Sequence, residues 1–207
     1  MARPGKILFI LCIGAALIMT GTLVCFAQDQ PVRARIGVII KSGDQVMRAK
    51  GKDSLKAGDS LRIYVQPDEG SYLYVVHADP DNVTLLKMVD RSVPSSQWVL
   101  PGEGDLYEVD GQSPIETFTI ICSPEELKEV AAIAGTKMPY EKWTALVGSL
   151  VKRGQIDLSQ KPEKPFPIAG NTRGEVLAGG RPERDCEAQV FSGNTILVKQ
   201  YEFTVKK

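Results

Sequence analysis

The sequence predicts a mainly β fold, an antiparallel β-sandwich-like domain with a two-helix insertion and a C-terminal strand, or α+β if the helices are counted. Short runs of apolar and β-branched residues recur from residue 32 to residue 122, and clusters of Gly, Pro and Asp separate them. Helical periodicity is confined to residues 124–153. A β-rich run then closes the chain, and a strand after so long an excursion implies a closed sandwich or barrel.

Seven strand patterns precede the helices, with short turns between most of them. They cover residues 32–40, 61–66, 72–77, 83–88, 98–100, 106–109 and 115–122. The run at 72–77 is apolar on both parities, which indicates a central position in its sheet. Because the turns on either side of it are short, residues 61–88 are expected to form a three-stranded antiparallel meander, since parallel neighbours need crossovers of about a dozen residues.

The helical insertion is expected over 124–153. Ser123 is a predicted N-cap, followed by a proline at the first helical position and a glutamate at the third. Gly135 ends this first helix. A second helix is expected from Pro139 to Arg153, and its buried face carries Trp143, Leu146, Val147, Leu150 and Val151.

The remaining chain is expected to return to the sheet. Residues 159–185 hold four prolines and four glycines with little apolar periodicity, so an extended connector is predicted there. Residues 195–205 are β-rich and predict the last strand. The whole of 28–207 is therefore interpreted as a single domain, within the size range of one hydrophobic core.

The N-terminus predicts export. Arg3 and Lys6 precede a nearly unbroken apolar run and a small residue at Ala27, the arrangement of a signal peptide over 1–27. The alternative is an uncleaved membrane anchor over 7–26, which is long enough to cross a bilayer. Both interpretations place the domain outside the cytosol, in the periplasm or secreted, and the membrane is a partner only through this segment if it stays uncleaved.

Two cysteines remain after removal of the signal segment, Cys122 and Cys186. In an oxidising compartment such a pair predicts a disulfide, which would stabilise the fold by about 4 kcal/mol in the chain-entropy model. The alternative is two unrelated thiols. Cys122 shares strand parity with Phe118 and Ile120 and is expected to face inward.

Composition argues against several partners. Hydrophobic residues make up 43% and charged residues 24% of the chain, which is ordinary for a globular protein. Basic and acidic residues both number 25, so no nucleic-acid partner is expected, because such binders carry a concentrated basic excess. With one histidine in the chain, a zinc site of the usual Cys/His composition is not expected.

No catalytic residue, metal ligand or cofactor is predicted. A Ser-x-x-Lys at 149–152 occurs in the wrong order relative to the other elements of penicillin-interacting serine enzymes, and an amphipathic helix explains it. His77 is expected to sit at the end of an apolar strand with one satisfied hydrogen bond. Asp79, Asp81 and Asn82 are assigned to a hairpin turn, because the ligand spacing of a calcium loop breaks at Val83.

Three aromatic residues are candidates for a binding surface. Tyr72 and Tyr74 lie two positions apart on one strand and could form a platform for a sugar or peptide, with Trp98 nearby. The alternative is that these rings pack against a second layer, as strand tyrosines commonly do.

Five stretches of the chain resemble a bacterial family catalogued as domain of unknown function 4384. They are residues 56–65, with a Gly-Asp before a strand, 70–76, with a Tyr-Leu-Tyr strand after a turn, and 100–104, 107–111 and 116–123. The resemblance covers roughly residues 55–130. It implies a β-sandwich-like module of exported or multidomain bacterial proteins, with no established reaction.

The function expected from these observations is that of an exported bacterial envelope protein, a non-catalytic binding or scaffolding module for an envelope protein or a glycan. Two alternatives stay open. One is a hydrolase that uses scattered carboxylates on a glycan substrate, which would need two acids converging in a deep pocket. The other is a periplasmic assembly or chaperone-like factor that pairs with a client through a sheet edge.

Overall fold

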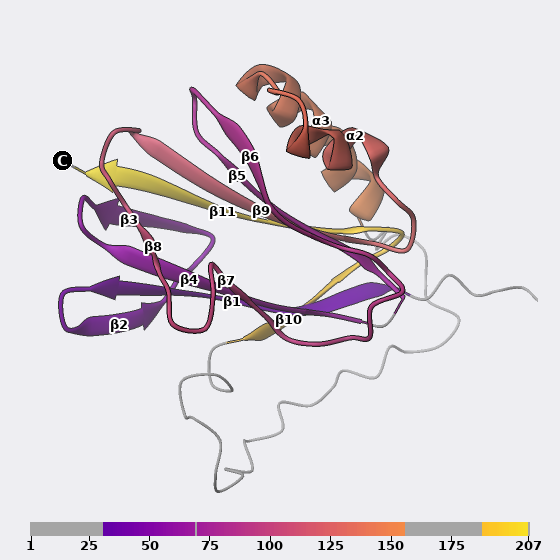
Figure 1. Cartoon of the computed structure of the whole chain (residues 1–207), viewed down its shortest axis with the longest axis horizontal. Helices are drawn as coiled ribbons and strands as arrows, with labels where there is room; N and C mark the ends of the chain where they lie inside the picture. Colours follow the sequence, from indigo (N-terminus) through magenta and orange to yellow (C-terminus); the bar gives the residue numbers. More distant parts are fainter. Residues whose placement is uncertain (1–30, 69, 156–187, 207) are drawn as a thin grey trace, which may run out of the picture.

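The computed structural model describes residues 31–68, 70–155 and 188–206, which form two facing β-sheets with helices on one side (Figure 1). The first sheet has the order β10-β1-β4-β7, with β2 paired to β1 and β8 paired to β4. Its strands are β1 (Val32–Ser42), β2 (Gln45–Arg48), β4 (Ser60–Pro67), β7 (Trp98–Leu100), β8 (Tyr107–Glu108) and β10 (Gln189–Gly193). The predicted mainly β, sandwich-like fold is confirmed.

The second sheet has the order β3-β11-β9-β5-β6. Its strands are β3 (Lys52–Lys56), β5 (Tyr72–Ala78), β6 (Val83–Val89), β9 (Ile115–Ser123) and β11 (Leu197–Lys206). Neighbouring strands are antiparallel except β3 and β11, which run parallel. The predicted C-terminal strand is thus confirmed as β11, in the interior of this sheet.

Alternate residues of the strands fill the space between the two sheets. Buried members of this core include Ile36, Val38, Ile63, Val65, Leu73, Val75, Phe118, Ile120, Cys122 and Phe203. The period of two follows from the pleat, which points successive side chains to opposite faces. Burial of this apolar surface stabilises the sandwich by about 25 cal/mol for each Å² removed from water.

A helical layer covers the outer face of the second sheet. It consists of α2 (Lys128–Ala131), the 3-10 helix η1 (Ala132–Ala134) and α3 (Tyr140–Gly154), above β5 and β9 in Figure 1. Trp143, Val147 and Leu150 of α3 are buried in one cluster with Tyr74 and Val76 of β5. Strand β5 is therefore covered on both faces, which is why its sequence is apolar on both parities.

The predicted three-stranded meander is wrong. β4 belongs to the first sheet and β5 to the second, so the turn after Pro67 carries the chain from one sheet to the other. Of the three strands of the predicted meander, only β5 and β6 pair as a hairpin. A short turn can join neighbours in one sheet or strands in two facing sheets, and alternation of apolar residues is the same in both cases.

The predicted start of the first helix is also wrong. Ser123 is the last residue of β9, where it pairs with Tyr72 of β5, and α2 begins at Lys128 without a side-chain cap. The Ser123 hydroxyl still accepts a hydrogen bond from the Glu125 N–H at 3.2 Å. The sheet ladder thus extends over the residue that the local pattern assigns to the cap. The second helix is confirmed, within one residue at each end.

Three strands were not predicted, namely β2, β3 and β10. All four residues of β2 are exposed, and β10 carries Val190 with 62% of its surface exposed. Each lies at an edge of its sheet or is paired on one side only, so none shows the apolar alternation by which a strand is recognised in a sequence.

Two predicted segments, the signal peptide or anchor within 1–27 and the connector at 159–185, lie outside the described residues. Across the residues that the structure does describe, no helix has both the length and the apolar character needed to span a membrane.

Candidate functional site

A cavity of about 370 Å³ lies between residues of the two sheets, with both residues of β8 in its lining. Its volume is in the range of small-ligand pockets. It is lined by Leu61, His77, Asp79, Asp81, Asn82, Leu86, Tyr107, Glu108, Val109, Asp110, Gln112, Ser113, Glu116 and Phe118.

The second sheet supplies a cluster of three titratable side chains on one wall. β5 and β9 are antiparallel with His77 opposite Phe118 and Ala78 opposite Thr117, so Asp79, directly after β5, and Glu116, directly before Thr117, lie at the same end of the pair. Residues two apart on a strand point to the same face, so His77, Asp79 and Glu116 all face the cavity. One ligand atom from each side chain lies within 4.8 Å of the others.

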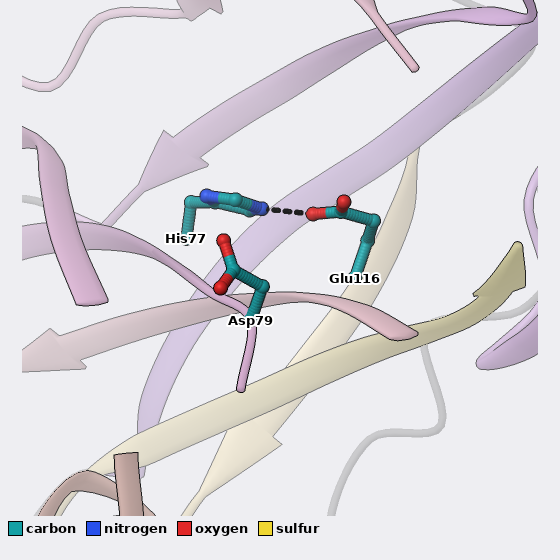
Figure 2. A group of neighbouring side chains, drawn as sticks. All are labelled: His77, Asp79 and Glu116. Atoms are coloured by element: carbon teal, nitrogen blue, oxygen red, sulfur yellow. Dashed lines mark hydrogen bonds and ion pairs between the residues drawn. The ribbon is translucent and has the colours of Figure 1, made fainter. Parts of the chain in front are cut away.

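The imidazole of His77 and the carboxylate of Glu116 form the closest contact in the cluster, a hydrogen bond between Nε2 and Oε2 (Figure 2). The two side chains are partly buried, with 22% and 13% of their surfaces exposed. The prediction that His77 ends an apolar strand with one satisfied hydrogen bond is confirmed. Its ring also packs on Phe118, with centroids 4.9 Å apart, so the cluster sits directly on the core.

Asp79 is held by the turn that it begins. Its Oδ1 accepts hydrogen bonds from the backbone N–H groups of Asp81 and Asn82, at 2.7 and 2.8 Å. The assignment of these three residues to a hairpin turn is confirmed. The carboxylate of Asp79 lies beside the His77–Glu116 pair (Figure 2), so the turn positions a charged oxygen toward the same space.

The first sheet and the loop after β8 form the opposite wall. Gly58 donates its N–H to the Val109 carbonyl, and Val109 donates its N–H to the Asp59 carbonyl, both at 2.8 Å. Gly111 adopts φ +73°, and a Cβ built there would lie 2.8 Å from the Cβ of Ala57. A glycine is therefore needed where this loop turns past the neighbouring one.

The inner surface of the cavity is apolar, and its rim is acidic. Leu61, Leu86, Tyr107 and Phe118 contribute to the lining, and burial raises the pKa of the Tyr107 hydroxyl above its ordinary value. The exposed Asp81, Glu108 and Asp110 join the two partly buried carboxylates, and no Lys or Arg is among the described residues that line the cavity. The five carboxylates outnumber the single imidazole of His77 and make this a site of negative potential, bounded by low-dielectric walls that focus the field.

The predicted aromatic platform is not formed. Tyr72 and Tyr74 stack with their centroids 6.4 Å apart, but both rings pack in the cluster beneath the helices, and Tyr74 is fully buried. The Tyr74 hydroxyl accepts the Leu127 N–H at 2.9 Å, and burial raises its pKa. The helical layer thus covers the face on which a ligand was expected.

Trp98 does not join the two tyrosines. It lies on β7 in the other sheet, where its partly buried ring packs against the core between the sheets. The Lys87 ammonium of β6 lies 4.4 Å from the ring centroid, a cation–π contact that bridges the two sheets.

Cys122 faces the core between the sheets, as its parity predicts, and is a fully buried thiol. The pKa of the Cys122 thiol is raised to about 12, mainly by burial and to a smaller extent by the charge of Asp68. Its predicted partner, Cys186, lies outside the described residues, so the disulfide stays a prediction.

No sequence pattern marks Glu116, Glu108 or Asp110 as site residues. Glu116 is 39 positions from His77, and only strand pairing brings them together. The one sequence pattern that bears on Glu116 is the alternation of strand residues. It places Glu116 on the same strand face as the inward-facing Phe118.

No family model matches the chain, and no curated protein or solved structure matches it. The resemblance noted for residues 55–130 stays a prediction.

Proposed function

We propose that this protein is an exported, non-catalytic binding module whose acidic cavity holds a basic side chain, arginine or lysine, of a partner protein in the cell envelope. One observation carries the proposal, the gathering of five carboxylates around a cavity whose described lining contains neither lysine nor arginine and only one histidine, His77. The negative potential of such a site attracts a cation from several ångströms away. Direct contact with a carboxylate then stabilises the bound cation.

The apolar inner surface of the cavity favours binding of a side chain of the partner protein over binding of a free cation. Arginine and lysine have a hydrocarbon stem as well as a charged head, and the stem packs well on apolar surface. Leu61, Leu86 and Tyr107 offer that surface beside the carboxylates. A guanidinium can also bind a carboxylate through two parallel hydrogen bonds, which adds geometric specificity.

A protein partner is favoured over a glycan because the aromatic platform expected for a sugar is covered by α3. Pairing through a sheet edge is less well supported, since the described edge strands β2, β3, β7, β8 and β10 have five residues or fewer. Only β6, with seven residues, offers a longer described edge.

A hydrolase remains a second candidate because carboxylates do converge in a pocket, as that alternative requires. Its acid and base would come from the partly buried members, Glu116 and Asp79. Turnover of a glycan substrate that is lost in both Glu116→Gln and Asp79→Asn would favour this candidate over simple binding.

The proposal is tested by titrating the purified protein with a short blocked peptide, acetyl-Gly-Arg-Gly-amide, and with the same peptide carrying citrulline. Citrulline has nearly the same shape as arginine but no charge. The arginine peptide is expected to bind at least about tenfold more tightly, and this preference should shrink as salt is added. Equal binding of the two peptides, or binding of neither, would contradict the proposal.

Two rim variants localise the effect. Glu108→Gln and Asp110→Asn each remove one charge, and the asparagine can still accept the Gln112 N–H that Asp110 now accepts at 2.8 Å. Both should weaken the arginine peptide. Glu141→Gln, an exposed change on α3, is the matched control and should have no effect. A partner captured from an envelope fraction by the unaltered protein should be lost with the two rim variants and kept with the control.

A further inference from the structure

We propose that His77, Asp79 and Glu116 bind a divalent first-row transition-metal ion such as Zn²⁺ at the inner wall of the cavity. The site goes beyond the capture of a basic side chain, because it has its own ligand set and its own chemistry. It is made by residues that the register of β5 and β9 places on one face.

The donor set suits such an ion. An imidazole nitrogen and carboxylate oxygens are the ligands of many open zinc sites, in which three protein groups leave a position for water or another ligand. Imidazole also distinguishes the set from the all-oxygen ligation that Ca²⁺ and Mg²⁺ prefer. The one histidine of the chain lies beside two carboxylates, and no other three His, Cys, Asp or Glu side chains among the described residues lie close enough together to hold one ion.

The distances require little adjustment. In a tetrahedral site, ligand atoms at about 2.0–2.2 Å from the ion lie about 3.3–3.6 Å apart. The three candidate atoms lie within 4.8 Å of one another, and Figure 2 shows the three side chains around one space. The separations therefore need to change by about 1 Å, which is within the reach of side-chain rotation.

Each ligand is held in place by the surrounding structure. The His77 ring packs on Phe118, and Asp79 is fixed through the two backbone N–H groups that its Oδ1 accepts. These bonds leave Oδ2 of Asp79 for the ion. Outer-shell support of this kind orients metal ligands and keeps their lone pairs directed at the metal.

Metal binding replaces the contact between His77 and Glu116. The ion takes the position of the proton between Nε2 and Oε2, and that proton moves to Nδ1 of the ring or leaves to solvent. Two carboxylates then balance the +2 charge of the ion, and the partial burial of both His77 and Glu116 shields the site from water.

The experiment uses Zn²⁺ alone, titrated into the metal-free purified protein by calorimetry, with Co²⁺ as a spectroscopic substitute. One equivalent of Zn²⁺ should bind. Co²⁺ should give a visible d–d spectrum without the intense thiolate charge-transfer band that a cysteine ligand would add. His77→Gln, Asp79→Asn and Glu116→Gln should each weaken Zn²⁺ by more than the roughly 10–100-fold loss that follows removal of an outer-shell partner.

Glu141→Gln serves as the control and should bind Zn²⁺ as the unaltered protein does. Because a cavity variant could unfold, the melting temperature of every variant is measured with and without Zn²⁺. The unaltered protein and the control should show a rise that the three variants lack. Absence of stoichiometric Zn²⁺ binding, or binding that survives all three substitutions, would overturn the inference.

The two proposals fail separately. Zn²⁺ binding without any preference for the arginine peptide would reject the basic-side-chain proposal and support the metal site. A preference for arginine in a protein that does not bind Zn²⁺ would reject the metal site and support the first proposal.

Discussion

The buried hydroxyl of Tyr74 offers the sharpest test of how the helical layer is joined to the sandwich. The side chain is fully buried, and its oxygen accepts the N–H of Leu127, a residue with 3% of its surface exposed, at 2.9 Å. Tyr74→Phe removes the acceptor and leaves that N–H buried without a partner. An unsatisfied buried donor costs about 1–3 kcal/mol, so the free energy of unfolding should fall by that amount.

Urea denaturation followed by circular dichroism measures the loss. With a typical slope of about 2 kcal/mol per molar urea, the midpoint should fall by roughly 0.5–1.5 M. Hydrogen exchange of the Leu127 amide should also accelerate, because in the variant this amide has no hydrogen bond that must break before it exchanges. Tyr72→Phe is the matched control, because its hydroxyl has no hydrogen-bond partner within the described part of the chain.

The reasoning is refuted if Tyr74→Phe and Tyr72→Phe lower the midpoint equally, or if the Leu127 amide exchanges at an unchanged rate. Either result would mean that the hydroxyl does not anchor the layer.

Three further predictions concern the core and the cavity rim. Trp143→Ala removes the largest buried side chain of α3 and should cost about 3–5 kcal/mol in urea denaturation, whereas a loss below 1 kcal/mol would mean that α3 is not a part of the core. Gly111→Ala places a side chain on a residue with φ +73° and against Ala57, so it should lower the free energy of unfolding by about 1–3 kcal/mol and weaken binding of the arginine peptide. Gly104→Ala is the control, because open space surrounds Gly104, and it should change the free energy of unfolding by less than about 0.5 kcal/mol. Burial raises the pKa of Tyr201 from 10.0 to about 12, so the folded state keeps its proton longer than the unfolded state, and the stability that this group contributes is complete below pH 10 and lost as pH rises toward 12. Tyr201→Phe should flatten the fall in stability over that interval, and an unchanged pH profile would contradict the assignment.

Much of the β framework could be predicted from the sequence because its signal is local. Alternation over a few residues placed β1, β4 and β9, and it turned Cys122 toward the core. The apolar face of α3 was equally readable, since Trp143 and Leu150 recur at helical spacing. Edge strands such as β2 left no such signal, because exposure removes the constraint on residue type.

The candidate site could not be predicted, because it depends on which strands become neighbours. An apolar strand face indicates that another element covers it, but it does not identify that element. The sequence therefore showed that Tyr74 lies on an apolar strand, and it did not show that α3 buries this side chain. His77 and Glu116 meet only because β5 pairs with β9, and no local pattern encodes a pairing across 39 positions. The sequence alone therefore determined the strands that carry an apolar face and the parity of their buried residues, because both follow from local alternation, while the assembly of two sheets decided that the carboxylates gather around one cavity.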